Sequence, residues 1–151
     1  AQERGQLRLL FQPVVDSGDE RITGFEALLR WHHPDLGLVS PLDFIPLAEE
    51  TGLIVPIGEW VIDEALAWAA RWPDHVKVSV NLSAVQVEDD SLPDVIAAAL
   101  ARHGVGPERL ELEITESLFL ADKPAVIDVL ARLTAMGVSF ALDDFGTGYS
   151  A

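Results

Sequence analysis

The chain has 151 residues, 49% of them hydrophobic, and a mean hydropathy of +0.23, which fits one domain with a real core and excludes a disordered chain. A formal net charge of −15 argues against direct binding to DNA or RNA, which needs a basic face. There is no cysteine, which excludes disulfides and thiolate metal sites, and no apolar run approaches the length of a membrane span.

The first half of the chain predicts a β-hairpin followed by helices. Residues 6–15 and 21–31 have the composition of strands, and the short turn-forming segment between them makes the pair antiparallel. We expect a loop over 32–37 and a helix that begins at Ser40-Pro41. Pro46 is expected to interrupt this helix, leaving two short turns that end near Gly52. A longer helix is expected from Pro56 to about Trp72.

The second half alternates strands with single helices. Strands are expected over 76–81, 110–114 and 138–143, and helices over 92–103 and 124–136. Gly104 and Gly137 follow the two helices, where glycine commonly ends a helix. This alternation predicts right-handed βαβ units and a parallel sheet. Trp60, Trp68 and Trp72 recur on one predicted helix and are expected to pack it against its neighbours.

Each predicted strand has one apolar face and one polar face. In the strand over 76–81 the valines alternate with Lys77, Ser79 and Asn81, and in the next strand aliphatic residues alternate with Glu111, Glu113 and Thr115. Helices must cover one face of a parallel sheet, and the aliphatic face suits that role. The polar face is then expected to point toward a common interior.

Four polar residues lie at or near the carboxyl ends of strands, where α/β folds bind ligands. They are Glu26, Asn81, Glu113 and Asp143. Their hard oxygen atoms suit Mg²⁺ or Mn²⁺ rather than Zn²⁺. Taken singly, each carboxylate could instead belong to a buried ion pair, with Arg30 as the natural partner of Glu26, and Asp143-Asp144 could be a solvated turn. Taken together, the four residues favour a cation site.

Several motifs resemble those of the EAL-domain cyclic di-GMP phosphodiesterases, in the same order and at similar spacing. The matching segments are residues 11–13, 26–31, 40–52, 80–83, 113–117 and 143–150, so that the resemblance runs from about residue 6 to residue 150. It implies an α/β fold, a TIM-like (β/α) barrel whose first strand is antiparallel. About five of the barrel's strands are expected within this chain.

The resemblance also implies an activity and a set of site residues. The family linearises cyclic di-GMP to pGpG with two divalent ions, Mg²⁺ or Mn²⁺, in bacterial signalling. Matched by position, Glu26, Asn81, Glu113 and Asp143 hold one ion, Asp143 is shared with the second ion, and Asp144 lies beside it. Glu116 matches a glutamate that holds the loop after the fifth strand, Gln12 and Arg30 match substrate contacts, and Asp43 is expected to approach a guanine.

The length of the chain bears on what it can do alone. A closed eight-stranded barrel takes about 250 residues, so residues 1–151 are expected to be the amino-terminal portion of a single EAL domain, cut after the fifth strand and inactive by themselves. Two alternatives to a phosphodiesterase stay open: a cyclic di-GMP receptor with weak or no turnover, and a structural or dimerisation module with a vestigial site. A cytoplasmic location is expected, and homodimerisation is a family-level expectation.

Overall fold

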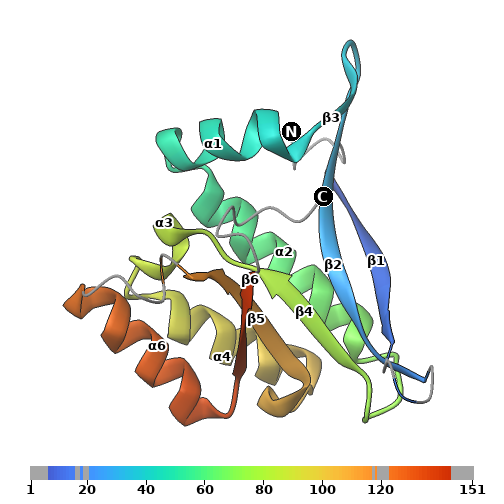
Figure 1. The fold of residues 1–151 in the computed structure, drawn as a ribbon, viewed down its shortest axis with the longest axis vertical. Helices are drawn as coiled ribbons and strands as arrows, with labels where there is room; N and C mark the ends of the chain where they lie inside the picture. The colour runs from blue at the N-terminus through green and yellow to red at the C-terminus, as the bar shows by residue number, and fades with distance from the viewer. Residues whose placement is uncertain (1–6, 16–17, 19–20, 117, 119–122, 144–151) are drawn as a thin grey trace.

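The structure is a computed structural model, and it describes residues 7–15, 18, 21–116, 118 and 123–143. For residues 41–43 and 143 it describes the backbone alone. A twisted sheet runs through the described part, with helices packed along one face (Figure 1). None of the helices in these ranges has both the length and the apolar character needed to cross a membrane.

The sheet begins with an antiparallel hairpin and continues with parallel strands. β1 (Leu7–Val15) pairs with β2 (Ile22–His33), as the sequence predicts. β4 (Lys77–Asn81), β5 (Leu110–Thr115) and β6 (Ser139–Asp143) then add in parallel, giving the order β1-β2-β4-β5-β6. The antiparallel first strand and the parallel βαβ units are both confirmed.

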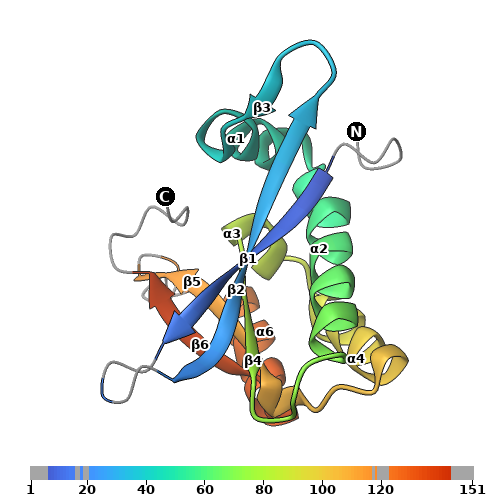
Figure 2. The ribbon, with the colours of Figure 1, turned by 90° about the vertical axis from the view of Figure 1, so that its right-hand side faces the viewer.

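A short strand that the sequence reading missed extends β2 into an arm. β3 (Gly37–Val39) pairs with the end of β2, and this second hairpin projects beyond the rest of the fold (Figure 2). His33 Nδ1 accepts hydrogen bonds from the backbone amides of Asp35 at 3.0 Å and Leu36 at 3.2 Å, which closes the turn. The predicted loop over 32–37 is therefore wrong at its ends, because His32 and His33 belong to β2 and Gly37 to β3.

The helices follow the predicted order, with two short additions. They are α1 (Pro41–Thr51), α2 (Ile54–Ala69), α3 (Ala84–Val87), α4 (Leu92–His103), the 3₁₀ turn η2 (Pro107–Arg109) and α6 (Pro124–Met136). α4 and α6 have the predicted bounds, and Gly104 and Gly137 follow them in the left-handed conformation. α3 and η2 are too short to produce a helical periodicity, so the sequence pattern did not reveal them.

Pro46 does not divide the first helix, contrary to the prediction. α1 is continuous from Pro41 to Thr51 with Pro46 inside it. Proline removes one backbone donor, but Pro46 is exposed, and the neighbouring Phe44, Ile45 and Ala48 are buried against Ile54. We attribute the continuity of the helix to this packing, which acts on both sides of the missing hydrogen bond.

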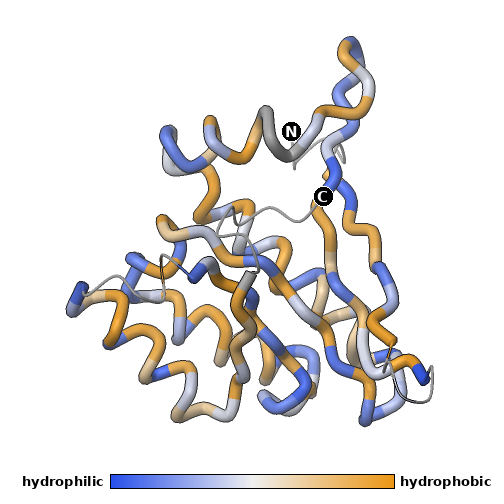
Figure 3. Tube along the Cα trace, viewed as in Figure 1, coloured by the Kyte–Doolittle hydropathy of each residue, from blue (hydrophilic) through white to orange (hydrophobic). Residues whose placement is uncertain are grey.

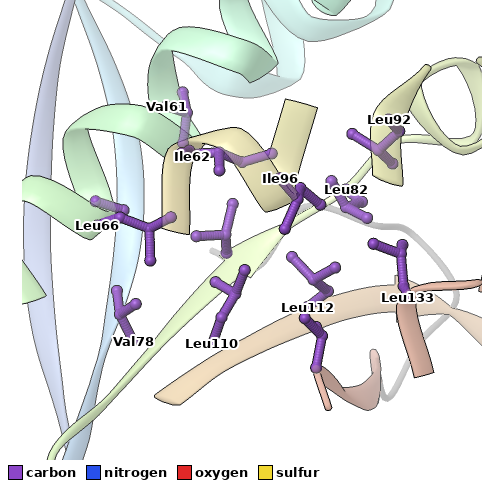
Figure 4. Close-up of a cluster of buried hydrophobic side chains, with 14 of the residues drawn as sticks. Val61, Ile62, Leu66, Val78, Leu82, Leu92, Ile96, Leu110, Leu112 and Leu133 are labelled. Carbon is purple, nitrogen blue, oxygen red and sulfur yellow. The ribbon is translucent and has the colours of Figure 1, made fainter. Parts of the chain in front are cut away.

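The main core lies between the helices and the aliphatic faces of β4 and β5. Val78, Leu110 and Leu112 are fully buried against residues of α2 and α4 such as Leu66 and Ile96 (Figure 4). Apolar and polar segments alternate along these elements (Figure 3), as expected for elements with one buried face. The helices thus occupy one face of the sheet, and the polar residues of β4 and β5 lie on the other.

The three tryptophans of the α2 region have the predicted packing role, to different degrees. Trp60 and Trp72 pack against the main core. The ring of Trp72 lies 5.3 Å from that of Phe11 in β1, whereas Trp68 is 42% exposed and contacts Phe11 at 6.1 Å. These aromatic contacts fasten β1 to α2 and to the segment that follows it.

Candidate functional site

The sheet register brings two predicted site residues from different strands into contact. Glu26 of β2 pairs with Ser79 of β4, and the pairing of these strands ends one step later at Ala27 and Val80. Asn81, the last residue of β4, donates a hydrogen bond from Nδ2 to Glu26 Oε2 at 3.1 Å. The contact joins residues that are 55 positions apart in the chain.

The next two strands continue the same polar row. Asn81 is in register with Glu113 of β5, and Thr115 of β5 is in register with Asp143 of β6. Glu26, Asn81 and Glu113 are all partly buried, at the end of the sheet to which the parallel strands point their carboxyl termini. The backbone of Asp143 therefore lies one strand beyond Glu113. Its side chain and all of Asp144 lie outside the described residues.

The chemistry of this row suits a hard cation. Asn81 turns its amide nitrogen toward Glu26, so its oxygen Oδ1 is the atom left to face a metal ion. Carboxylate and amide oxygens are the donors that Mg²⁺ and Mn²⁺ prefer. Within the described residues, no three acidic or histidine side chains gather closely enough to form a metal site by themselves. Glu26, Asn81 and Glu113 have the donor chemistry for a hard cation, and the side-chain contact among them joins Glu26 and Asn81.

Arg30 does not form the ion pair with Glu26 that was considered as the structural alternative. Its Nη1 donates to the backbone oxygen of Leu29 at 2.9 Å, while Glu26 accepts from Asn81. Gln12 of β1 is in register with Glu26 and is exposed. Gln12 therefore lies beside Glu26 on β1, and Arg30 lies four residues further along β2 than Glu26.

The two remaining predicted residues, Glu116 and Asp43, belong to other elements than this row. Glu116 directly follows β5 and is exposed, and the Oγ1 atom of neighbouring Thr115 accepts a hydrogen bond from the amide of Leu118 at 3.1 Å. This bond turns the chain as it leaves the strand. Asp43 lies in the first turn of α1, where only its backbone is described.

A hollow beside Asn81 contains polar residues that the sequence reading missed. It is lined by apolar residues of β2, α1 and α2 and by the polar side chains of Arg30, Asn81, Ser83 and Gln86. Ser83 and Gln86 form a capping box at the start of α3, in which each side chain accepts a hydrogen bond from the other's backbone amide. The spacing Ser-x-x-Gln is the sequence signal that could have revealed it.

Comparison with known proteins shows the family of this chain. The sequence pattern of the EAL domain matches residues 1–151. The chain belongs to the EAL domain family. Its strand order and the antiparallel first strand are those of a TIM-like barrel, of which the described residues form the hairpin and three further strands in parallel.

Curated relatives of this EAL chain include signalling proteins that are much longer. It is 50% identical over 154 residues to MucR of Pseudomonas aeruginosa, a bifunctional diguanylate cyclase/cyclic di-GMP phosphodiesterase, covering 99% of the chain and 22% of the relative. It is 43% identical over 145 residues to a cyclic di-GMP phosphodiesterase of the same organism, covering 94% of the chain and 25% of that protein. The chain thus spans a quarter or less of these two relatives.

Solved EAL structures superpose closely on the described fold. A complex of the MucR phosphodiesterase with cyclic di-GMP has a TM-score of 0.91 and 49% identity, covering 100% of this chain and 63% of that one. The EAL domain of FimX from Pseudomonas aeruginosa, bound to cyclic di-GMP, has a TM-score of 0.83 and 30% identity, covering 96% and 59%. Both neighbours contain cyclic di-GMP on the fold that this chain shares.

Proposed function

We propose that this chain carries the first cation site and part of the substrate site of a divalent-metal-dependent phosphodiesterase that opens cyclic di-GMP to linear pGpG. The observation that supports this most is the hydrogen bond between Asn81 and Glu26, in register with Glu113, at the strand ends of an EAL fold. In this proposal Glu26, Asn81, Glu113 and Asp143 hold one ion, and Asp144 lies beside a second.

The chain's own residues have distinct roles in the proposed reaction. When bound, the ions would polarise the phosphodiester of the substrate and lower the pKa of a water molecule. Arg30 binds a phosphate oxygen of the substrate, since guanidinium groups suit phosphate, and Gln12 orients the substrate from the opposite strand of the hairpin. Asp43 approaches a guanine, and Glu116 keeps the loop after β5 in the shape that the cation site needs.

The charge of the protein gives the cation a second role. The chain has a formal net charge of −15, and cyclic di-GMP carries two phosphates, so the two repel each other in the absence of metal. A cation between Glu26 and the phosphodiester would reverse the sign of the local field. Binding of substrate is therefore expected to depend on Mg²⁺ or Mn²⁺.

The first test compares two glutamates of one strand in the full protein that carries this chain. Glu111 and Glu113 share a face of β5 and are both partly buried, but Glu113 alone is in register with Asn81. Glu113→Gln and Glu26→Ala are each expected to reduce pGpG formation at least about 100-fold, because they remove a cation ligand. Glu111→Gln is the matched control and is expected to retain most of the activity.

The same experiment separates this proposal from a receptor. Product is followed by chromatography with Mg²⁺ or Mn²⁺ present and again after chelation, and binding of cyclic di-GMP is measured by calorimetry. Saturable binding without pGpG over hours would establish a receptor instead. Turnover that survives Glu26→Ala would contradict the cation assignment. The 151-residue chain alone is expected to show no turnover, because a closed eight-stranded barrel takes about 250 residues.

A further inference from the structure

A buried glutamine lines the hollow beside Asn81, and the side-chain hydrogen bond described for it goes to the backbone of Ser83 rather than to a predicted ligand. Gln86 of α3 is 5% exposed. Its Oε1 atom accepts a hydrogen bond from the backbone amide of Ser83 at 3.1 Å, and Ser83 Oγ accepts one from the backbone amide of Gln86 at 3.3 Å. The side chain of Gln86 therefore holds the backbone two residues after Asn81.

The place of Gln86 depends on a glycine in another helix. Gly58 is a buried residue inside α2, where glycine is less favourable than alanine. A Cβ atom at this position would collide with Gln86 Nε2 and would lie 2.5 Å from its Cδ. The amide of Gln86 thus occupies the space that a side chain at Gly58 would fill. The two residues fit as a pair across α2 and α3.

The backbone that follows Asn81 is held from two sides. The amide of Leu82 donates to the backbone oxygen of Glu113 in β5 at 2.9 Å. The amide of Ser83 donates to Gln86, which rests on α2. Between these bonds and the ladder of β4, the main chain at Asn81 has little freedom, so its side chain is directed at Glu26. A ligand held this way needs little ordering when a cation binds.

We propose that Gln86, which packs against Gly58, is a positioning residue for Asn81. By holding Asn81 it also positions the Asn81–Glu26 pair. It keeps the Asn81 amide oxygen directed toward the cation by fixing the Ser83 amide. This inference rests on the proposed function, because the cation is part of that function. Gly58 is required as the surface on which Gln86 rests, and both residues act without touching the substrate.

The test uses the full protein with Gly58→Ala, Gln86→Ala and the double variant. Ser91→Ala is the control: Ser91 precedes α4, is exposed, and donates from Oγ to Asp89 at 2.8 Å, so this variant also removes a side-chain hydrogen bond beside a helix but none at the site. Three quantities are measured: Mn²⁺ affinity by calorimetry without substrate, amide hydrogen exchange at Ser83 without metal, and KM for cyclic di-GMP at saturating Mn²⁺.

Both single variants are expected to lower Mn²⁺ affinity about tenfold or more, the range seen when a supporting hydrogen bond behind a metal ligand is removed. Exchange at the Ser83 amide is expected to become faster, with KM at saturating Mn²⁺ unchanged. The double variant is expected to bind Mn²⁺ no more weakly than Gln86→Ala, because alanine at 58 then meets empty space. Such non-additivity identifies a direct contact between the two positions.

The outcomes distinguish this inference from the proposed function. If Gln86→Ala speeds exchange at Ser83 but leaves Mn²⁺ affinity unchanged, Gln86 is a helix cap alone and the inference is overturned while wild-type turnover stands. If the wild-type protein binds no Mn²⁺ and forms no pGpG, the proposed function is wrong. The inference is then wrong as well, because it depends on that function. Gln86→Ala introduces no clash. Its Mn²⁺ affinity and its exchange at the Ser83 amide therefore test the inference even if Gly58→Ala does not fold.

Discussion

Arg109 shows how a single buried side chain joins distant parts of this fold. It is 7% exposed, and its guanidinium donates to three backbone oxygens in the segment that connects α2 to β4. The acceptors are Ala69 at 2.7 Å, Pro73 at 3.2 Å and Val76 at 3.1 Å. The oxygens of Ala69 and Pro73 also accept the backbone amides of Trp72 and Val76. Arg109 adds a charged donor to these carbonyls and joins the end of α2 to the start of β4. The position of β4, and hence of Asn81, depends on this segment.

Replacing Arg109 should therefore cost much more stability than replacing an exposed arginine. We expect Arg109→Met to lower the free energy of unfolding by about 3 kcal/mol, because buried carbonyls lose charged donors. Arg132→Met is the control: Arg132 reaches the exposed Asp94 at 3.6 Å and Asp128 at 3.9 Å, and such pairs contribute about 0–1 kcal/mol. Urea denaturation of both variants measures the difference, and equal losses would contradict this role for Arg109.

The residues of the site differ in how far sequence can locate them. Glu26 and Asn81 could be placed together because both lie on the polar faces of strands that end at one edge, and the structure confirms their contact. Arg109 and the pair of Gly58 and Gln86 could not, since their roles depend on contacts between elements far apart in the chain. A glycine inside a helix gives no sign of what occupies the space beside it.

At the scale of single elements, the end of α4 depends on one left-handed residue. Gly104 has a φ of 66° and a ψ of 33°, and the amide of the following Val105 donates to the backbone oxygen of Leu100 at 3.0 Å. No atom lies within 4 Å of a Cβ built on Gly104. Any loss caused by a substitution there would come from the backbone conformation rather than from a clash.

A pair of substitutions at Gly104 should separate backbone strain from packing. Gly104→Ala is expected to destabilise the protein by about 1 kcal/mol, because alanine disfavours the left-handed region. Gly104→Asn should cost less, since asparagine tolerates that region at helix ends. Thermal unfolding of the two variants gives the order. A larger loss with asparagine would show that space, not conformation, limits this position.

The elements that sequence predicted best are those with terminal signals. α4 and α6 begin beside a proline and end before a glycine, and their bounds agree with the structure. α1 was mispredicted because the local effect of Pro46 was overridden by burial of its neighbours. β3 was missed because three residues are too few to show alternation, and its pairing depends on the turn that His33 closes.

For the molecule as a whole, apolar side chains at both edges of the sheet should govern its behaviour in isolation. Within the described residues, β1 pairs with β2 alone and β6 with β5 alone. Leu10 of β1 is 53% exposed and Leu142 of β6 is 48% exposed. Exposed edge strands with apolar side chains favour association with other chains. The isolated 151-residue chain is therefore expected to self-associate as its concentration rises.

Sedimentation velocity tests this expectation with charged substitutions at the edges. Leu10→Lys combined with Leu142→Lys should reduce the average mass at a given concentration. The net charge becomes less negative in this variant, which weakens repulsion between chains and by itself would raise the average mass. A reduction in mass therefore cannot come from the change in net charge. Leu36→Lys is the control, because Leu36 is 73% exposed in the turn of the arm, away from both edges. Equal effects of the edge and control variants would exclude edge pairing as the cause.

The contact between Glu26 and Asn81 also has a consequence for the order of folding. β1 and β2 are joined by a short connection, whereas β2 and β4 are joined by residues 34–76, which include β3, α1 and all of α2. Closing a long connection costs more chain entropy and slows the formation of the contacts that depend on it. The hairpin can therefore form early, but the contact between Glu26 and Asn81 forms only after the long crossover has closed. Metal binding would then report completed folding of the sheet.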